Sequence, residues 1–332
     1  YLAREKKSGA PVAIKRLKVL EQMEGLANTT LREITILHSL KNLNEAKHFT
    51  ALREVIMAPD YRSMHLVFEF VEHSLYGLMV QGVRFTEADL RCVFRQVLKG
   101  LTVLHEAHIV HRDIKPNNIL LDSSGVVKLC DFGLAFSTTS GRQRITPRLV
   151  ALAYRPPEML LNAKTYSAAV DVWSVGCMLA QVYLGGAPPF MRNAKQPADS
   201  EVEQLNLIGA AYGIRAAHIG ALIGILPEGV EPVPASPVAD VVCEQHLTAR
   251  LERHLVSMAR DRRQPPIPKP VLSIICRALS LDPARRPSAR ELLRSGWFMN
   301  AVNEAVERAA MARRIRETIG DRFCHGPAAV KR

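Results

Sequence analysis

Residues 111–133, with the sequence HRDIKPNNILLDSSGVVKLCDFG, decide the interpretation of the whole chain. Four polar side chains follow one another along this stretch: Asp113, Lys115, Asn118 and Asp131. Transfer of a phosphoryl group from ATP needs a carboxylate that orients the attacking hydroxyl, a cation near the migrating group and two oxygen ligands for Mg²⁺. The four residues offer one group of each kind, so the stretch predicts phosphoryl transfer.

The composition is that of an ordinary globular protein. The chain has 332 residues, of which 48% are hydrophobic and 23% charged, so it can bury a sizeable core. Its six cysteines are scattered without a C-x-x-C pair, which favours reduced thiols in an intracellular protein, in the nucleus or cytoplasm. The chain opens at Tyr1 rather than Met, and we expect the true N-terminus to be missing.

The net charge of +12 is uneven and is concentrated in residues 245–332. Such an excess fits contact with acidic proteins, nucleic acid or an anionic surface, but a solvated helix face is the interpretation we favour. The longest apolar run, 207–226, carries Arg215 and His218 in its middle. We therefore expect a buried or partly buried helix there rather than a membrane span, and no membrane partner.

Near the N-terminus, residues 10–20 have the β-branched and apolar composition of a strand around Lys15. A lone Lys on a strand is usually a solvent-exposed charge. Glu33, on the expected following helix, is the candidate ion partner. The competing interpretation is a capping box in which Thr30 and Glu33 mark a helix start.

Further along, residues 65–71 read as a strand that ends near Glu69 and Val71. Residues 86–107 form the clearest helix, since Thr86 and Asp89 give a start signal and apolar residues recur at helical spacing. Helical patterns also cover 167–184 and about 301–318, the second followed by a frayed basic end.

Five further motifs accompany the central stretch: VAIK at 12–15, EGLANTTLRE at 24–33, FVEHSLYGLM at 70–79, YRPPE at 154–158 and DVWSVGC at 171–177. With them, the chain resembles a eukaryotic Ser/Thr protein kinase of the cyclin-dependent branch, most similar to PITSLRE-type kinases. The resemblance covers about residues 1–298. It implies an α+β, two-lobed protein kinase fold, with a small β-rich N-lobe and a larger helical C-lobe.

The same resemblance implies a division of the chain. Residues 1–71 would be a partial N-lobe that lacks the glycine-rich loop, and residues 72–298 a C-lobe with a loop-rich insert at about 190–270. Residues 299–332 would be a basic C-terminal tail.

Carried over by position, the resemblance implies the following roles. Asp113 orients the substrate hydroxyl, and Lys115 stabilises the charge of the transferred group. Mg²⁺ is held by Asn118 and Asp131. ATP is bound through the side chains or backbone of six residues: Lys15, Glu33, Glu69, Val71, Asn118 and Asp131. For Glu69 and Val71, an ordinary buried strand would give the same pattern.

Regulatory and structural roles follow from the same comparison. Thr146 matches an activating phosphothreonine, with Arg32 and Arg112 as part of its basic receptor, against the alternative of an unmodified surface Thr. Glu158 and Arg286 would form a buried ion pair, against the alternative of an exposed Arg. Asp171 would anchor the backbone of the central stretch.

Departures from the family pattern qualify this interpretation. The glycine-rich loop is absent, and Phe136 stands where the family has a third phosphate-binding Arg. Ala151 replaces a Thr whose hydroxyl usually braces the catalytic Asp and Lys, and Ala153 replaces a Trp.

We predict an active Ser/Thr kinase that uses ATP and Mg²⁺, prefers Ser or Thr followed by Pro and is regulated by a cyclin-type subunit. The alternative is a catalytically impaired kinase-fold scaffold, or pseudokinase, that binds a cyclin. Retention of all six polar site groups argues against it. Nucleic acid is not expected as a partner, because no pattern of stacking aromatic residues accompanies the basic tail.

Overall fold

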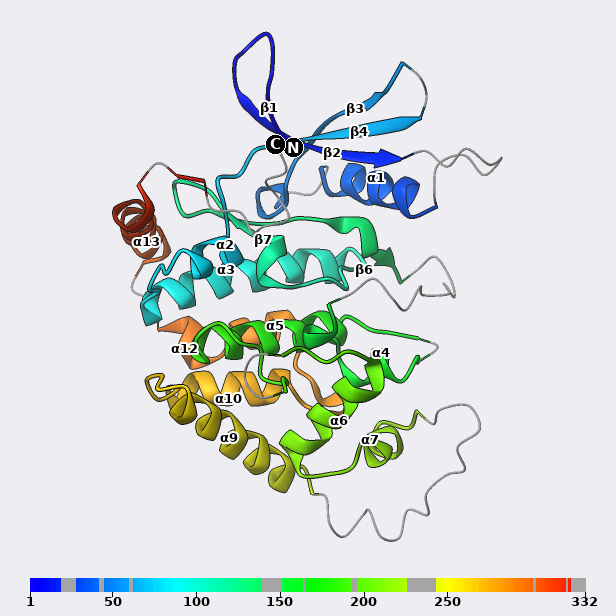
Figure 1. The fold of residues 1–332 in the computed structure, drawn as a ribbon, viewed down its shortest axis with the longest axis vertical. Helices are drawn as coiled ribbons and strands as arrows, with labels where there is room; N and C mark the ends of the chain where they lie inside the picture. Colours follow the sequence, from blue (N-terminus) through cyan, green and yellow to red (C-terminus); the bar gives the residue numbers. More distant parts are fainter. Residues whose placement is uncertain are drawn as a thin grey trace. The chain divides into compact units, whose positions relative to one another are not determined.

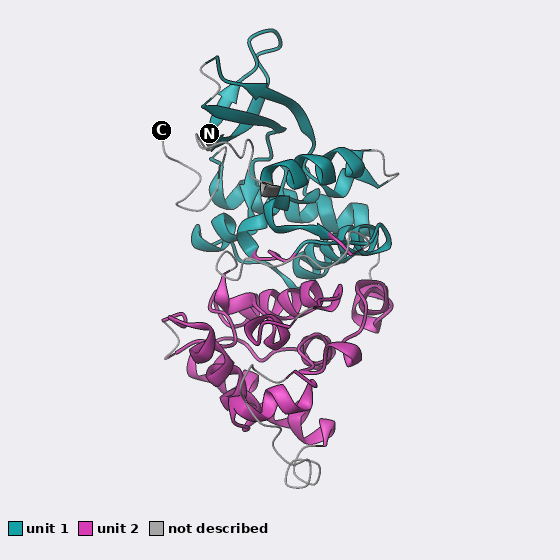
Figure 2. Ribbon diagram, turned by 90° about the vertical axis from the view of Figure 1, so that its right-hand side faces the viewer, with its two compact units in different colours: residues 1–111, 116–136, 300–332 teal, residues 112–115, 137–299 magenta. Residues whose placement is uncertain are grey.

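The computed structural model describes residues 1–18, 28–41, 45–59, 62–138, 151–163, 165–192, 196–225, 243–300, 303–320 and 322–323, with backbone only at residues 18, 28 and 29. These residues pack into two compact units (Figure 2). Unit 1 comprises residues 1–111, 116–136 and 300–332, and unit 2 comprises residues 112–115 and 137–299. The lobe boundaries expected at residues 71 and 298 stay a prediction.

Unit 1 combines sheet and helix. Its elements are β1 (Leu2–Arg4), β2 (Pro11–Lys18), α1 (Asn28–Lys41), the 3-10 turn Ala46–His48, β3 (Leu52–Met57), β4 (Ser63–Glu69), β5 (His73–Ser74), α2 (Leu75–Val80), α3 (Glu87–Glu106), β6 (Ile109–Val110), the 3-10 turn Pro116–Asn118, β7 (Ile119–Leu121), β8 (Val127–Leu129), the 3-10 turn Phe132–Leu134 and α13 (Glu304–Ile319). The short strand β9 (Phe136–Ser137) lies where the chain passes into unit 2.

The main sheet of unit 1 is antiparallel, with strand order β1-β2-β4-β3 (Figure 1). The register pairs Lys15 with Leu66 and Val12 with Glu69, so the expected strands around Lys15 and before Val71 are direct neighbours. A second sheet has the order β5-β7-β8.

The structure tests both capping boxes considered for unit 1, at Thr86 and at Thr30. Helix α3 has the expected capping box, in which Thr86 Oγ1 accepts from the Asp89 N–H and Asp89 accepts from the Thr86 N–H. The alternative capping box at Thr30 is wrong, because Thr30 lies inside α1, which already includes Asn28.

Unit 2 is mainly helical. Its elements are the 3-10 turn Leu152–Tyr154, α4 (Pro157–Leu160), α5 (Ala169–Tyr183), α6 (Glu201–Tyr212), α7 (Ala216–Leu222), α9 (Glu244–Asp261), α10 (Lys269–Ala278), the 3-10 turn Pro283–Arg285, α11 (Ala289–Leu293) and α12 (Gly296–Met299). Helix α5 lies at the centre of its core, where the buried Trp173 stacks on Phe190 with ring centroids 5.6 Å apart.

The apolar run expected to be helical is helical in two pieces, the end of α6 and the separate helix α7, rather than one element. Gly213 adopts a left-handed backbone with φ 65° and ends α6, and a separate helix, α7, begins at Ala216. Left-handed backbone costs Gly little, which makes it a frequent helix terminator. None of the described helices is both long and apolar enough to cross a membrane. The expected α+β fold is confirmed, with a small antiparallel sheet and a larger helical part.

Candidate active site

In unit 1, the ammonium group of Lys15 lies between two carboxylates. Its Nζ donates to Glu33 Oε1 at 2.7 Å and to Asp131 Oδ1 at 2.8 Å. The Glu33 side chain is 4% exposed, whereas that of Asp131 is 45% exposed. Strand β2, helix α1 and the segment after β8 each contribute one of the three charges, so the cluster exists only when all three elements are in place.

Burial and charge act in opposite directions on this cluster. Burial by itself would lower the pKa of Lys15, but the Coulombic attraction of Asp131 and Glu33 outweighs it and the pKa is raised. Burial raises the pKa of the Glu33 carboxyl, and Lys15 opposes this change. The cluster therefore keeps Lys15 charged, as binding of phosphate groups requires.

The β7–β8 hairpin places Asn118 and Asp131 at the same end. Ile119 pairs with Leu129, and the N–H of Cys130 donates to the carbonyl oxygen of Asn118 at 3.1 Å. Asp131 follows directly, with a left-handed backbone at φ 63°. Such a conformation is strained for a residue other than Gly and is found preferentially at functional sites.

The aromatic ring of Phe132 fixes the segment that carries Asp131. The ring is buried, with centroids 4.9 Å from His111 and 6.0 Å from Phe49. His111 Nε2 lies 3.1 Å from the carbonyl oxygen of Cys130. Packing on one side and a hydrogen bond on the other therefore hold the position of the carboxylate.

The donor set fits Mg²⁺, which prefers oxygen ligands and is commonly held by one or two protein side chains together with phosphate groups. Asn118 and Asp131 supply an amide oxygen and a carboxylate. A Cβ added at Gly133 would lie 3.4 Å from Asp131 Oδ1 and 3.6 Å from Lys15 Nζ. The glycine therefore leaves room beside both charged groups.

Of the two residues expected to face the adenine, Glu69 ends β4 and Val71 lies two residues beyond it. The Glu69 carboxylate accepts from Lys128 Nζ and from the Ala51 N–H, both at 2.8 Å. Val71 is buried. The Lys128 contact was not predictable from the sequence, because the two residues are far apart in the chain and no local pattern joins them.

In unit 2, Lys115 Nζ donates to Asp113 Oδ2 at 2.7 Å, and Asp113 is buried. The preceding residue, Arg112, has a left-handed backbone at φ 65°, and its N–H donates to Asp171 Oδ1 at 2.8 Å. Asp171 lies in the first turn of α5 and is fully buried, so this largely buried helix positions the backbone next to Asp113.

The structure also brings Glu158 and Arg286 together. The guanidinium group donates to Glu158 Oε1 at 2.5 Å and to Oε2 at 2.8 Å, and it lies 4.9 Å from the ring centroid of Trp173. A second ion pair, in which the buried Arg155 donates to Glu201 at 2.5 Å, was not expected from the sequence.

The regulatory residues are only partly described. Arg32 is half-buried on α1, and Arg112 is buried. Thr146 lies outside the described residues. Ala151 precedes the 3-10 turn Leu152–Tyr154 and has no hydroxyl group to offer.

Comparison with known proteins agrees with this geometry. Residues 1–298 match the model of the protein kinase domain. The chain is 33% identical over 314 residues to cyclin-dependent kinase C-1 of Arabidopsis thaliana, covering 90% of the chain and 56% of that protein. It is 32% identical over 299 residues to cyclin-dependent kinase G-1 of Oryza sativa subsp. indica, covering 90% of the chain and 40% of that protein.

A third relative is cyclin-dependent kinase 12 of Drosophila melanogaster, which is 33% identical over 306 residues, covering 90% of the chain and 24% of that protein. The chain thus spans only part of the length of these relatives. The family match nevertheless covers nearly the whole chain, and it confirms the family expected from the sequence. The chain belongs to the protein kinase domain family.

Proposed function

We propose that the chain is the kinase domain of a Ser/Thr protein kinase of cyclin-dependent type, which transfers the γ-phosphoryl group of ATP to Ser or Thr followed by Pro. The observation that carries the proposal is the position of Lys15 Nζ between Glu33 and Asp131. The names of the relatives support the cyclin-dependent type. The preference for a following Pro rests on the resemblance of the YRPPE motif alone.

Unit 1 supplies the groups proposed to bind ATP. Lys15 binds the phosphates as a point charge, and Glu33 fixes its direction. The backbone groups of Glu69 and Val71 face the adenine. When bound at Asn118 and Asp131, Mg²⁺ neutralises charge on the phosphates.

Unit 2 supplies the groups proposed to act on the protein substrate. The Asp113 carboxylate orients the substrate hydroxyl and accepts its proton as the oxygen attacks the γ-phosphorus. The bond between the γ-phosphorus and the bridging oxygen breaks, and ADP leaves. Lys115, which already contacts Asp113, stabilises the negative charge on the transferred group.

The test compares wild type with Asp113→Asn in the full chain, using transfer of labelled phosphate to a Ser-Pro peptide and calorimetric binding of ADP. We expect Asp113→Asn to lose at least about a hundredfold in kcat while ADP binding is kept. The exposed Asp261→Asn is the matched control and should behave as wild type. Equal rates in wild type and Asp113→Asn would refute the proposed chemistry.

The same experiment addresses the scaffold alternative. Ala151 is the observation that favours it, because no hydroxyl is available there to brace Asp113 and Lys115. A scaffold would bind a cyclin-type subunit without measurable phosphate transfer by wild type.

We further propose that a cyclin-type subunit docks beside α1. Apolar side chains are exposed there: Leu31 on α1, and Val55, Ile56 and Met57 on the edge strand β3. A groove of about 400 Å³ lies between the same two elements. Exposed apolar side chains next to a sheet edge are typical of interaction sites, and Val55 lines the groove itself.

A panel of cyclins first identifies the one that wild type binds most tightly. The docking proposal predicts that Val55→Glu, which changes a residue lining the groove, weakens binding of that cyclin. Val202→Glu, which changes an exposed valine of α6, is the control and should leave binding unchanged. Equal weakening of cyclin binding by both variants, or no weakening by either, contradicts the proposed surface.

For Thr146, we propose phosphorylation in the active enzyme, so Thr146→Ala should lower peptide phosphorylation several-fold.

A further inference from the structure

Helix α13 follows the residues that match the kinase family, since the match ends at residue 298. It is nevertheless an integral part of unit 1, where it packs on α3 (Figure 1). A solvated helix face and a frayed basic end were expected in this region, and α13 does expose one face, with the Arg313 side chain 77% exposed. The contacts of its other face give α13 a defined position on unit 1.

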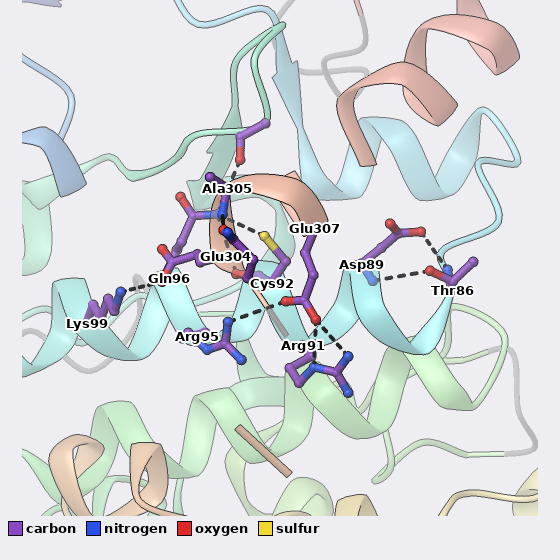
Figure 3. A network of polar contacts seen from close by, with 12 residues as sticks. Thr86, Asp89, Arg91, Cys92, Arg95, Gln96, Lys99, Glu304, Ala305 and Glu307 are labelled. Atoms are coloured by element: carbon purple, nitrogen blue, oxygen red, sulfur yellow. Dashed lines mark hydrogen bonds and ion pairs between the residues drawn. The ribbon is translucent and has the colours of Figure 1, made fainter. Parts of the chain in front are cut away.

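Charged side chains join α13 to α3 (Figure 3). Glu307 is buried and accepts from Arg91 at 2.7 Å and from Arg95 at 3.3 Å. One turn earlier, Glu304 accepts from Lys99 Nζ at 2.5 Å. Buried charge pairs are costly to break one partner at a time, so they fix the register between the two helices.

The apolar face of α13 is buried as well, with Met311, Ile315 and Ile319 nearly inaccessible to solvent. The backbone of α13 also approaches the turn before β8 closely. A Cβ at Gly125, whose φ is +79°, would lie 2.7 Å from the carbonyl oxygen of Arg308. Only glycine tolerates both this conformation and this approach.

Beyond α13 the chain reaches the segment expected to bind adenine. Arg322 Nε donates to the carbonyl oxygen of Ile319 at 2.8 Å. The ring of Phe323 packs edge to face on Phe70, with centroids 4.9 Å apart and planes at 73°. Phe70 stands between Glu69 and Val71, the two residues proposed to present backbone groups to the adenine.

From these contacts we infer that Phe323 is a positioning residue for nucleotide binding. With α13 fixed on α3, Phe323 holds the ring of Phe70, and thereby the backbone of residues 69–71, in the conformation that receives adenine. The opposite end of the same segment is already held by Glu69, through Lys128 and Ala51. This inference rests on the proposed binding of ATP.

The test uses Phe323→Ala in the full chain, with Phe323→Tyr as the conservative variant. Loss of one edge-to-face aromatic contact should raise the Kd for ADP and the KM for ATP by about two- to tenfold. The kcat and the melting temperature should stay as in wild type, and Phe323→Tyr should restore the affinity. Val306→Ala, an exposed position on α13, is the control and should match wild type.

A double-mutant cycle with Phe70→Ala sharpens the test. If Phe323 acts through Phe70, adding Phe323→Ala to Phe70→Ala should cause no further loss of ADP affinity. Unchanged ADP affinity in Phe323→Ala, with a wild type that binds ADP, would overturn this inference and leave the proposed function intact. A wild type that binds no ADP would overturn both.

Discussion

Replacement of Arg286 by Met should destabilise unit 2 strongly. The guanidinium group donates to both oxygens of Glu158, to the carbonyl oxygen of Ser280 at 2.7 Å and to that of Leu281 at 3.1 Å. The Arg286 and Glu158 side chains are 0% and 4% exposed. Methionine would leave the buried Glu158 carboxylate and these two carbonyl groups without their donors.

The expected cost is about 3–5 kcal/mol, the range for removing one partner of a buried ion pair. With a urea m-value of about 2 kcal/mol/M, the unfolding midpoint should fall by about 2 M. Both tryptophans of the chain, Trp173 and Trp297, are buried in unit 2. Their fluorescence therefore reports the unfolding of the unit that holds the ion pair.

The control is Arg260→Met, which removes an exposed arginine of α9 whose Nε lies 3.7 Å from Asp261. Exposed pairs contribute little, so its midpoint should match wild type. Combining Glu158→Leu with Arg286→Met should restore part of the lost stability, since no uncompensated charge remains. A loss below about 1 kcal/mol in Arg286→Met would refute the importance of this buried pair.

Three further predictions concern the backbone, pH and thiols. Asp171→Ala removes the acceptor of the Arg112 N–H, and urea unfolding should show a loss of about 1–3 kcal/mol together with slower peptide phosphorylation. Burial lowers the pKa of His254 in the folded protein, so the unfolded chain binds a proton there more readily. The free energy of unfolding should therefore fall as the pH drops below about 6.5. His254→Gln should flatten this part of the pH–stability profile, and an unchanged profile would contradict the lowered pKa of His254. Burial raises the pKa of Cys276 to about 12, whereas Cys243 is exposed. Mass spectrometry after alkylation should therefore find Cys243 modified before Cys276. The reverse order would contradict the burial of Cys276.

Local signals in the sequence were sufficient for some elements. The capping box at Thr86 and the apolar spacing that follows it predicted 86–107, and the helix covers Glu87–Glu106. The helix expected at 167–184 is α5, Ala169–Tyr183. These elements are determined mainly by neighbours a few residues apart, which a sequence displays directly.

Long-range contacts could be predicted from the sequence only where both partners belong to recognisable motifs. The Glu158–Arg286 pair was expected, because both halves belong to recognisable motifs. The contacts of Glu69 with Lys128 and of Phe323 with Phe70 were not, because each depends on tertiary packing that no local pattern records. The break at Gly213 was missed for a related reason: the apolar run continues past it, so composition hides the turn.

The central claim, ATP-dependent phosphoryl transfer organised around Lys15, is tested most directly by Lys15→Met. The measurement is transfer of labelled phosphate from ATP to a Ser-Pro peptide by the full chain, in the presence of the cyclin that binds it. Arg16→Met, at the exposed next position of β2, is the matched control. We predict that Lys15→Met lowers kcat/KM for ATP by at least about a hundredfold while Arg16→Met retains the wild-type value. A wild-type rate in Lys15→Met would contradict the account.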